Sequence, residues 1–286
     1  DEMTVFEDGE NPRAGSLTSR MEFFRTTAES ALDSLYGSGA AAPGELIHVT
    51  CTGYVSPSPP LVLASKKKWF DLRVTQLYHS GCFAAVPAVR LASSSRSGVV
   101  DVVHTELCSL HFDVDVFTPE QIVVQSLFAD GVVRYRCSER AIGTSFRLES
   151  VSERIIPESL DDMTWIVRDR NFRMTLSRSV PAKIREALPA FVQGIRGGSG
   201  PAIYAIHPGG PLVIQSVAEA LGLAEDQYRH SVEVLKYKGN MSSATLPTVW
   251  RSILEDTQVP AGTPVISLAF GPGLTLCGTL MKKVAA

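Results

Sequence analysis

The chain lacks the features that mark membrane-embedded or nucleic-acid-binding proteins. No apolar run approaches the roughly 20 residues that a membrane-spanning helix needs, and no signal peptide is recognisable. The formal net charge is −3, so the chain has no positive field that would attract the phosphates of a nucleic acid. We therefore expect a protein with no membrane span and no nucleic-acid partner.

Paired cysteines are also missing. The chain has 5 cysteines, an odd number, and they are widely separated without a Cys-x-x-Cys pair. This pattern argues against a disulfide framework and against a structural zinc site. We expect free thiols, no metal and a reducing, cytoplasmic location.

Strand and helix patterns alternate along the 286 residues, of which 44% are hydrophobic and 20% charged. This composition is ordinary for a globular protein, and the alternation predicts an α/β fold with a mixed, largely buried sheet. Predicted strands lie at 46–51, 73–78, 99–107, 131–137, 145–156, 175–180, 202–206, 264–270 and 274–280. Predicted helices lie at 21–35, 61–70, 83–93, 120–128, 182–191, 211–221, 225–237 and 245–255.

One cysteine stands where a nucleophile is expected. Cys82 follows a predicted strand and Gly81, and a small apolar run begins directly after it at Phe83. Glycine permits a tight turn there, and the start of a helix would favour a thiolate over a thiol. The alternative is a buried structural cysteine, because free cysteine is among the most buried residue types.

Two downstream residues match this cysteine chemically. His207 ends a buried strand and precedes Pro-Gly-Gly, while Asn240 lies in a turn before a predicted helix. Taken separately, His207 reads as a core histidine and Asn240 as a helix N-cap. Together with Cys82 they form an acyl-transfer set, with a nucleophile, a group that helps generate the thiolate, and two hydrogen-bond donors for a carbonyl oxygen that gains charge.

Four separated motifs carry a family resemblance: Ser-Gly-Cys82-Phe, Ile-His207-Pro-Gly-Gly, Gly-Asn240-Met-Ser-Ser and Phe-Gly271-Pro-Gly-Leu. In this order and approximate spacing, from about Leu46 to the C-terminus, the chain resembles the chalcone-synthase-like type III polyketide synthases. The segment 124–131 also matches that family. The segment 104–112 is similar to bacterial alkylresorcinol and alkylpyrone synthases, which use long fatty acyl starters.

The resemblance implies a thiolase-like fold with two pseudo-equivalent βαβαβ halves in a layered αβαβα arrangement. Residues 1–137 would form the half that carries the nucleophile, and residues 138–286 the half that carries His207 and Asn240. Family members have further sequence upstream, so we expect that part to be missing here. The family's homodimers imply a homodimer for this chain.

The resemblance also implies the reaction. An acyl-CoA starter, here a long-chain fatty acyl group, would load onto Cys82 and be extended with malonyl-CoA. His207 and Asn240 would stabilise the enolate that remains after CO2 is lost. Cyclisation would then give a pyrone or a resorcinol, and no cofactor is needed beyond the two CoA thioester substrates.

The remaining site residues come from the same resemblance. Phe128 and Met174 correspond to the two gatekeepers between the CoA tunnel and the cavity, and Met174 departs from the plant pattern. Cys108 and His111 replace small hydroxyl residues of the plant enzymes, and Trp165 lies near a position that is glycine there, although it also fits a core role. The cavity floor would consist of Gly271, Pro272 and Gly273.

Three other interpretations remain open from the sequence. A ketoacyl synthase of the same fold would use Cys82, His207 and Asn240 for one condensation and release a linear product. A silent partner subunit is disfavoured because all three residues are present. A cysteine hydrolase is disfavoured because the turn that holds Asn240 suits an oxyanion role.

Overall fold

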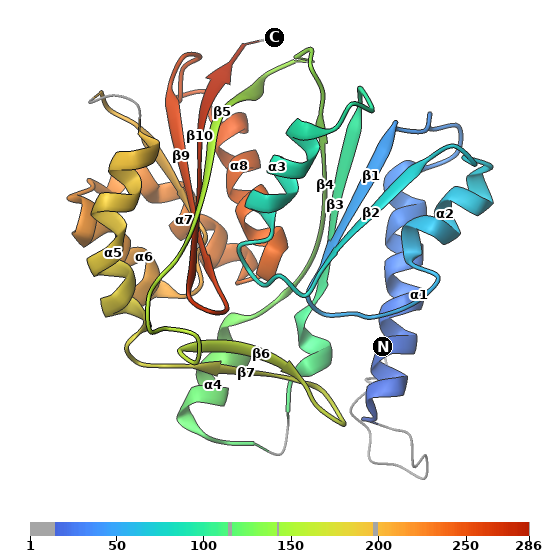
Figure 1. The fold of residues 1–286 in the computed structure, drawn as a ribbon, viewed down its shortest axis with the longest axis horizontal. Coiled ribbons are helices and arrows are strands. Elements are labelled where there is room, and N and C mark those ends of the chain that lie inside the picture. Colours follow the sequence, from blue (N-terminus) through green and yellow to red (C-terminus); the bar gives the residue numbers. More distant parts are fainter. Residues whose placement is uncertain (1–14, 114–115, 142, 197–199, 286) are drawn as a thin grey trace.

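The computed structural model describes residues 15–113, 116–141, 143–196 and 200–285. Two four-stranded sheets stand side by side in it (Figure 1). The first sheet has the order β2-β1-β3-β4, with β1 (Glu45–Thr50), β2 (Arg73–Tyr78), β3 (Val100–Leu107) and β4 (Asp130–Cys137). The second has the order β5-β10-β9-β8, with β5 (Ser145–Ile155), β8 (Ile203–Ile206), β9 (Pro264–Gly271) and β10 (Thr275–Val284).

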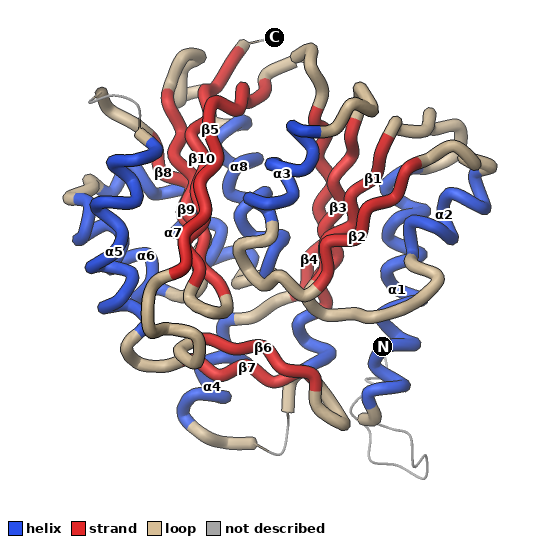
Figure 2. Tube along the Cα trace, viewed as in Figure 1, coloured by secondary structure: helices blue, strands red, loops and turns tan. Residues whose placement is uncertain are grey.

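Helices cover both outer faces of the pair of sheets and fill the space between them, which gives five layers (Figure 2). The first sheet carries α1 (Leu17–Tyr36) and α2 (Pro59–Lys67) on its outer face. Between the sheets lie α3 (Ala85–Ser94) and α8 (Thr245–Glu255), which share one apolar core with strands of both. The second sheet is covered by α5 (Val180–Ile195), α6 (Pro211–Leu221) and α7 (Glu225–Lys238).

The carboxyl ends of the parallel strands of the first sheet lie at one edge of that sheet. Strand β1 pairs in parallel with β2 and with β3, whereas β4 is antiparallel to β3. Their carboxyl ends lead into the segments that carry Cys51, Cys82 and Cys108. Ligands commonly bind at this edge of such sheets, because the loops after the strands meet there.

A small cap lies below that edge. It consists of the 3₁₀ turn η1 (Cys108–His111), helix α4 (Pro119–Leu127), and an antiparallel pair formed by β6 (Met163–Val167) and β7 (Phe172–Leu176) (Figure 1). A second 3₁₀ turn, η2 (Ser242–Ala244), leads into α8. None of the helices in the described part of the chain is both long and apolar enough to cross a membrane.

The sequence predictions differ from the structure mainly in this cap. The strand predicted at 175–180 is wrong, because β7 ends at Leu176 and α5 begins at Val180. Strand β6 was not predicted at all. Its five residues stand among Pro157, two aspartates and an arginine-rich turn, so the polar surroundings hide the short alternation.

Candidate active site

Cys82 lies in a tight turn between β2 and α3. Gly81 has a φ of 91°, which is the left-handed region that glycine adopts readily. A Cβ at Gly81 would lie 2.4 Å from Cδ of Pro272, so a larger residue does not fit. This turn buries Cys82 to 6% exposure and places its Sγ 3.7 Å from Oγ of Ser242.

The thiol of Cys82 is uncharged rather than ionised. Burial raises its pKa to about 12, although the contact with Ser242 acts in the opposite direction. This shift is opposite to the one expected from a helix start. The reason is geometric, because α3 begins only at Ala85 and the sulfur is withdrawn from water. Cys82 therefore needs a base before it can attack.

His207 is a buried imidazole with unused hydrogen-bonding capacity. It follows β8, and its backbone N–H donates to the carbonyl oxygen of Leu268 at 2.7 Å. Burial lowers the pKa of His207 to about 4, so the ring is neutral at pH 7. Neither ring nitrogen has a hydrogen-bond partner among the described residues, and its exposure is 1%. Because buried polar groups are nearly always paired, this ring is suited to bind a ligand.

Asn240 is oriented by its own turn. Its Oδ1 accepts hydrogen bonds from the Ser242 backbone N–H at 3.0 Å and from the Thr245 hydroxyl at 3.3 Å. Its Nδ2 therefore faces the other way, 3.5 Å from the carbonyl oxygen of Gly209, two residues after His207. The N-cap residue of α8 is Ala244, so Asn240 does not cap that helix. The side-chain amide keeps donor capacity next to the His207 turn.

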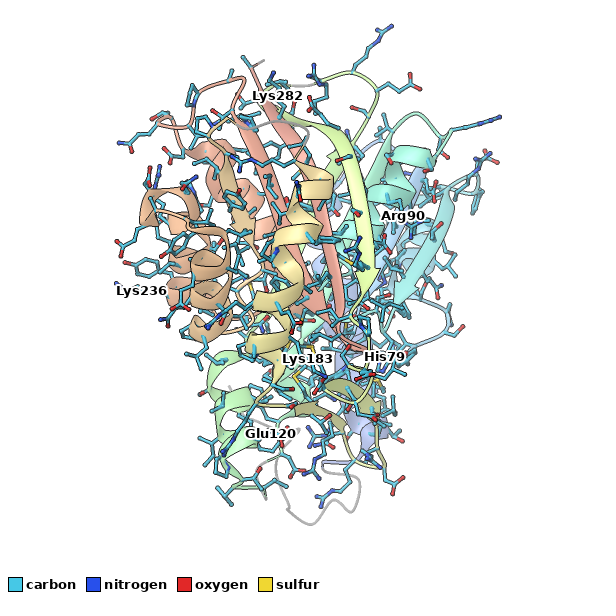
Figure 3. All side chains as sticks on the ribbon, turned by 60° about the vertical axis from the view of Figure 1, so that its left-hand side comes forward. His79, Arg90, Glu120, Lys183, Lys236 and Lys282 are labelled. Atoms are coloured by element: carbon cyan, nitrogen blue, oxygen red, sulfur yellow. The ribbon has the colours of Figure 1, made fainter. Side chains whose placement is uncertain are left out.

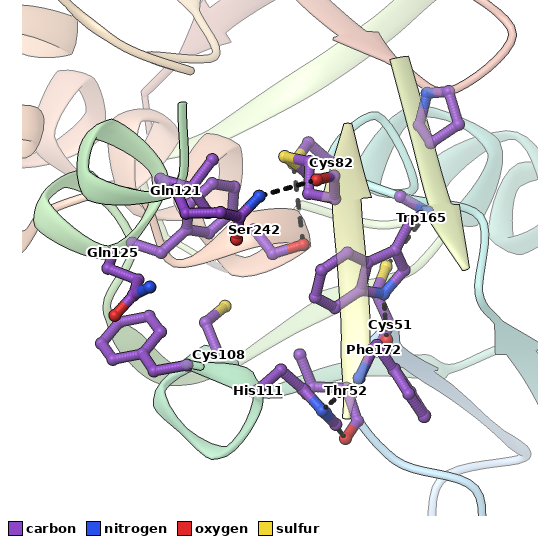
Figure 4. A pocket seen from close by; sticks show the side chains of 16 residues that line it. Cys51, Thr52, Cys82, Cys108, His111, Gln121, Gln125, Trp165, Phe172 and Ser242 are labelled. Carbon is purple, nitrogen blue, oxygen red and sulfur yellow. Dashed lines mark hydrogen bonds between the residues drawn. The ribbon is translucent and has the colours of Figure 1, made fainter. Parts of the chain in front are cut away.

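Cys82 opens onto a pocket beneath the first sheet (Figure 4). The lining residues are Cys51, Thr52, Gly81, Cys82, Cys108, His111, Phe112, Gln121, Val124, Gln125, Phe128, Trp165, Phe172, Met174, Ser242 and Pro272. Only about 30 Å³ of it is open to the centre of a water-sized sphere. The pocket is therefore narrow.

Seven of the residues that the sequence predicts for the site line this pocket. Besides Cys82, the predicted residues that line the pocket are Phe128, Cys108, His111, Trp165, Met174 and Pro272. His207 and Asn240 are not among its lining residues. Gly271 and Gly273 are not either. A Cβ on Gly271 would meet the Phe83 ring at 2.3 Å, so this glycine serves close packing instead.

Asn240 nevertheless lies directly behind the pocket wall. It forms an isolated parallel bridge with Phe128, and its backbone N–H donates to the Leu127 carbonyl oxygen at 2.8 Å. Ser242, two residues further, lines the pocket beside Cys82. The turn that carries Asn240 thus connects the His207 side of the site with the Cys82 side.

Aromatic rings from the cap narrow the pocket. The rings of His111 and Phe172 stack with centroids 4.1 Å apart. His111 Nε2 donates to the Thr52 carbonyl oxygen at 2.7 Å, and Trp165 Nε1 donates to that of Cys51 at 2.7 Å. The rings of His111 and Trp165 are thus held to the loop after β1, so the cap is fixed against the sheet edge.

The β6–β7 pair is also held from its other sides. Figure 3 places Glu120, Lys183 and His79 near that end of the molecule. Glu120 accepts the Leu176 backbone N–H at 2.6 Å, and His79 Nε2 donates to the Trp165 carbonyl oxygen at 2.8 Å. Lys183 forms an ion pair with Asp162. These contacts connect the β6–β7 hairpin with α4, α5 and the nucleophile turn.

Some lining residues escaped the sequence interpretation. Cys51 directly follows β1, just as the nucleophile turn follows β2, and its Sγ accepts the Gly81 N–H at 3.0 Å. The parallel strands predicted there would have been enough to place it at the same edge. For Phe172 and Gln121 the sequence offers no comparable indication, because it does not show which face of their strand or helix turns toward the pocket. The described residues include no cluster of His, Cys, Asp and Glu that could hold a metal.

Comparisons with known proteins agree on one family. Residues 147–285 match the family described as chalcone and stilbene synthases, C-terminal domain. The chain is 30% identical over 260 residues to "Probable polyketide synthase 1" of Dictyostelium discoideum, which covers 84% of this chain and 8% of that protein. It is 26% identical over 243 residues to 1,3,6,8-tetrahydroxynaphthalene synthase of Streptomyces griseus, covering 80% of this chain and 64% of that protein.

The fold agrees with these matches. The crystal structure of the C-terminal type III polyketide synthase domain of Steely1, a type I/III hybrid from Dictyostelium, superimposes with a TM-score of 0.84 at 27% identity. The superposition covers 94% of this chain and 80% of that one, which confirms the thiolase-like fold expected from the motifs. The fold, the motif order and the sequence matches agree that this chain is similar to type III polyketide synthases over most of its length, and its residues 147–285 match the C-terminal domain of the chalcone and stilbene synthases.

Proposed function

We propose that the protein is an acyltransferase that condenses an acyl-CoA starter with malonyl-CoA. His207 takes the Cys82 proton, the thiolate attacks the starter carbonyl, and the CoA thiol leaves with that proton. The chain spans 8% and 64% of the two relatives described above, so their activities are carried over as a proposal only. The observation that carries it is the buried, unpartnered His207 imidazole, two residues before the Gly209 carbonyl oxygen that accepts from Asn240, on whose turn Ser242 contacts the buried Cys82 thiol.

Malonyl-CoA then supplies two carbons. The bond between its carboxylate and C2 breaks, CO2 leaves, and the electron pair forms an enolate. Hydrogen bonds from His207 and Asn240 to the enolate oxygen stabilise that charge, and losing one such donor typically costs about 100-fold or more in rate. The enolate carbon attacks the acyl group on Cys82 and expels the thiolate. The reaction needs no cofactor beyond the two thioesters.

Covalent loading tests the first step directly. Incubation with an acyl-CoA should add the mass of one acyl group to the intact protein, and Cys82→Ala should abolish the increment. Cys277→Ala is a matched control, since that thiol is buried against α3 and α8 and does not line the pocket. Continued loading of the Cys82→Ala protein would show that another residue is the nucleophile.

We further propose a long-chain fatty acyl starter, several extensions and closure to a pyrone or resorcinol, carried out by a cytoplasmic homodimer. The similarity of residues 104–112 to alkylresorcinol and alkylpyrone synthases supports this. A long chain would need the cap to open, because the pocket is narrow.

That narrowness favours a second candidate. A ketoacyl synthase of the same fold would hold a short acyl group on Cys82, add one malonyl unit and release a linear product. Mass analysis of the products from starters of 2 to about 16 carbons separates the two. A ring built from several malonyl units supports the first proposal, and a linear product extended by two carbons supports the second.

A further inference from the structure

A buried carboxylate lies behind the turn that carries Asn240. Glu106 of β3 has no exposed surface, and its Oε2 accepts hydrogen bonds from the Cys51 backbone N–H at 2.9 Å and the Thr52 hydroxyl at 3.0 Å. Its Oε1 accepts a hydrogen bond from the Ser243 hydroxyl. Burial raises the pKa of Glu106, and these hydrogen bonds oppose that shift. Glu106 thus ties the Ser243 turn to the loop after β1.

His104 binds the same hydroxyl from the neighbouring position on the strand. It is two residues before Glu106, so both side chains lie on one face of β3. Its Nδ1 is 3.0 Å from Oγ of Ser243, and its Nε2 is 3.3 Å from the Tyr135 hydroxyl. The His104 ring also stacks on that of Tyr135, with 26° between the planes, and is itself fully buried.

The direction of each hydrogen bond follows from counting hydrogens. The Ser243 hydroxyl has a single hydrogen, which it donates to Glu106. Its oxygen must therefore accept from His104, so Nδ1 carries the ring hydrogen. Nε2 is then the unprotonated nitrogen and accepts from Tyr135. The chain Tyr135 to His104 to Ser243 to Glu106 has one consistent direction and fixes one tautomer.

The turn held in this way is strained and carries the chemistry. Ser242 has a φ of 49°, which is unfavourable for a residue other than glycine and persists only where surrounding contacts enforce it. Its backbone N–H binds Asn240, and its hydroxyl lies 3.7 Å from Sγ of Cys82. Ser243 comes next in the chain. Contacts at Ser243 therefore set where Asn240 and Ser242 lie.

We propose that His104 is a positioning residue that holds the Asn240–Ser243 turn in place through the Ser243 hydroxyl. It does not touch the substrate and acts only through that turn. This inference rests on the proposed function, because the turn matters for rate only if Asn240 serves as a donor to the reacting thioester.

Two substitutions at His104 separate positioning from packing. His104→Phe keeps a ring but removes both hydrogen bonds, and we expect kcat to fall about 10-fold or more with KM within about twofold, since small displacements of catalytic groups cost this much. His104→Asn keeps an N–H donor near the Nδ1 position and should recover most of the loss. Tyr135→Phe removes only the distal hydroxyl and should cost about threefold, a fraction of the effect of the nearer bond.

His48 is a matched control in the adjacent strand. It is equally buried and hydrogen-bonds Tyr78 at 2.8 Å and Thr105 at 3.2 Å, but it has no hydrogen bond to the Ser243 turn. His48→Phe should lower thermal stability as much as His104→Phe while leaving kcat within about twofold, because it leaves the turn intact. Equal kcat losses in both variants, or no recovery with Asn, would overturn the proposal.

A measurement without substrate keeps the two proposals distinguishable. The rate at which iodoacetamide alkylates Cys82, followed by intact mass, should differ from the wild-type rate by about threefold or more in His104→Phe but not in His48→Phe. The reason is that Ser242, on the turn that His104 holds, contacts the Cys82 sulfur. If the wild-type protein turns over no starter but this difference appears, the proposed function fails and the positioning role stands. If turnover is normal and His104→Phe behaves like the wild type in both assays, only the positioning role fails.

Discussion

Cys82 and His207 are both buried, and burial shifts the pKa of each toward its uncharged form. A neutral thiol and a neutral imidazole carry no net charge, so neither pays the large desolvation cost of a buried ion. In the proposed reaction, the proton moves only when a thioester is present to accept the sulfur. Charge on these two residues would then develop during the reaction rather than beforehand.

Gly81, in the nucleophile turn, should be the glycine of the site that tolerates substitution least. We predict that Gly81→Ala lowers the free energy of unfolding by about 3 kcal/mol, because a methyl group would add a clash to an unfavourable φ. The clash is with Pro272, at 2.4 Å. Chemical denaturation measures the change.

Gly98→Ala separates the two causes. Gly98 has a φ of 75°, and nothing lies within 4 Å of a Cβ there. This variant should lose only about 1 kcal/mol, the cost of the backbone conformation alone. Equal losses at both positions would mean that the contact between Gly81 and Pro272 contributes nothing.

The sequence predicts the three proposed reacting residues because each lies in a compact local motif. Cys82, His207 and Asn240 all follow a strand or precede a helix, beside glycines whose role is local. The residues behind them gave no such signal. Glu106 and His104 act through contacts with a turn more than 130 positions away, and no local pattern encodes those contacts.

At the scale of elements, the β6–β7 pair decides the size of the pocket. Its inward residues, Trp165, Phe172 and Met174, line the cavity, while Ile166 and Arg173 point outward and are exposed. The sequence placed Trp165 and Met174 at the cavity only through the family resemblance. Periodicity alone failed here, because five-residue strands flanked by polar turns resemble a loop.

Removing the largest of these side chains should change which substrates fit. We predict that Trp165→Ala opens the pocket and shifts the preference toward longer starters or longer products, with kcat/KM for a long-chain acyl-CoA rising relative to a short one by about 10-fold or more. A 10-fold ratio corresponds to the burial of roughly one to two additional methylene groups of the longer acyl chain. Competition between two acyl-CoAs, with products separated by mass, measures it.

Ile166→Ala is the neighbouring control. Ile166 is adjacent in β6 but 43% exposed and outside the pocket lining, so its loss should leave the chain-length preference unchanged. An unchanged preference in Trp165→Ala as well would show that the cap does not limit the substrate.

At the scale of the molecule, the two sheets are less alike than the resemblance suggested. Strands β1, β2 and β3 with α2 and α3 form the expected parallel βαβαβ unit. The second sheet has only β8 parallel to β9, and both β9 and β5 are antiparallel to β10. Alternating strands and helices in sequence predict the class of fold, but strand direction depends on contacts across the sheet that no local pattern carries.

Five buried histidines make the whole fold sensitive to mild acid. Burial lowers the pKa of His48 and His104 to about 3 and that of His111 and His207 to about 4, and it also lowers the pKa of His230. In the unfolded chain a histidine titrates near pH 6.5. The unfolded state therefore binds more protons between about pH 6.5 and pH 4, and stability falls as the pH falls through that window.

We predict a steep loss of stability between pH 7 and pH 5. Each such histidine contributes a slope of up to about 1.4 kcal/mol per pH unit below its unfolded pKa, and most carboxylates remain ionised in this range, so the histidines dominate. Urea denaturation at pH 7, 6 and 5 should give unfolding midpoints that move to lower urea concentration as the pH falls. His48→Gln removes one titrating group from the core and should flatten the slope by about one proton, even if the variant is less stable at pH 7. Midpoints that stay constant from pH 7 to pH 5 would mean that these rings accept protons without unfolding the core that surrounds them.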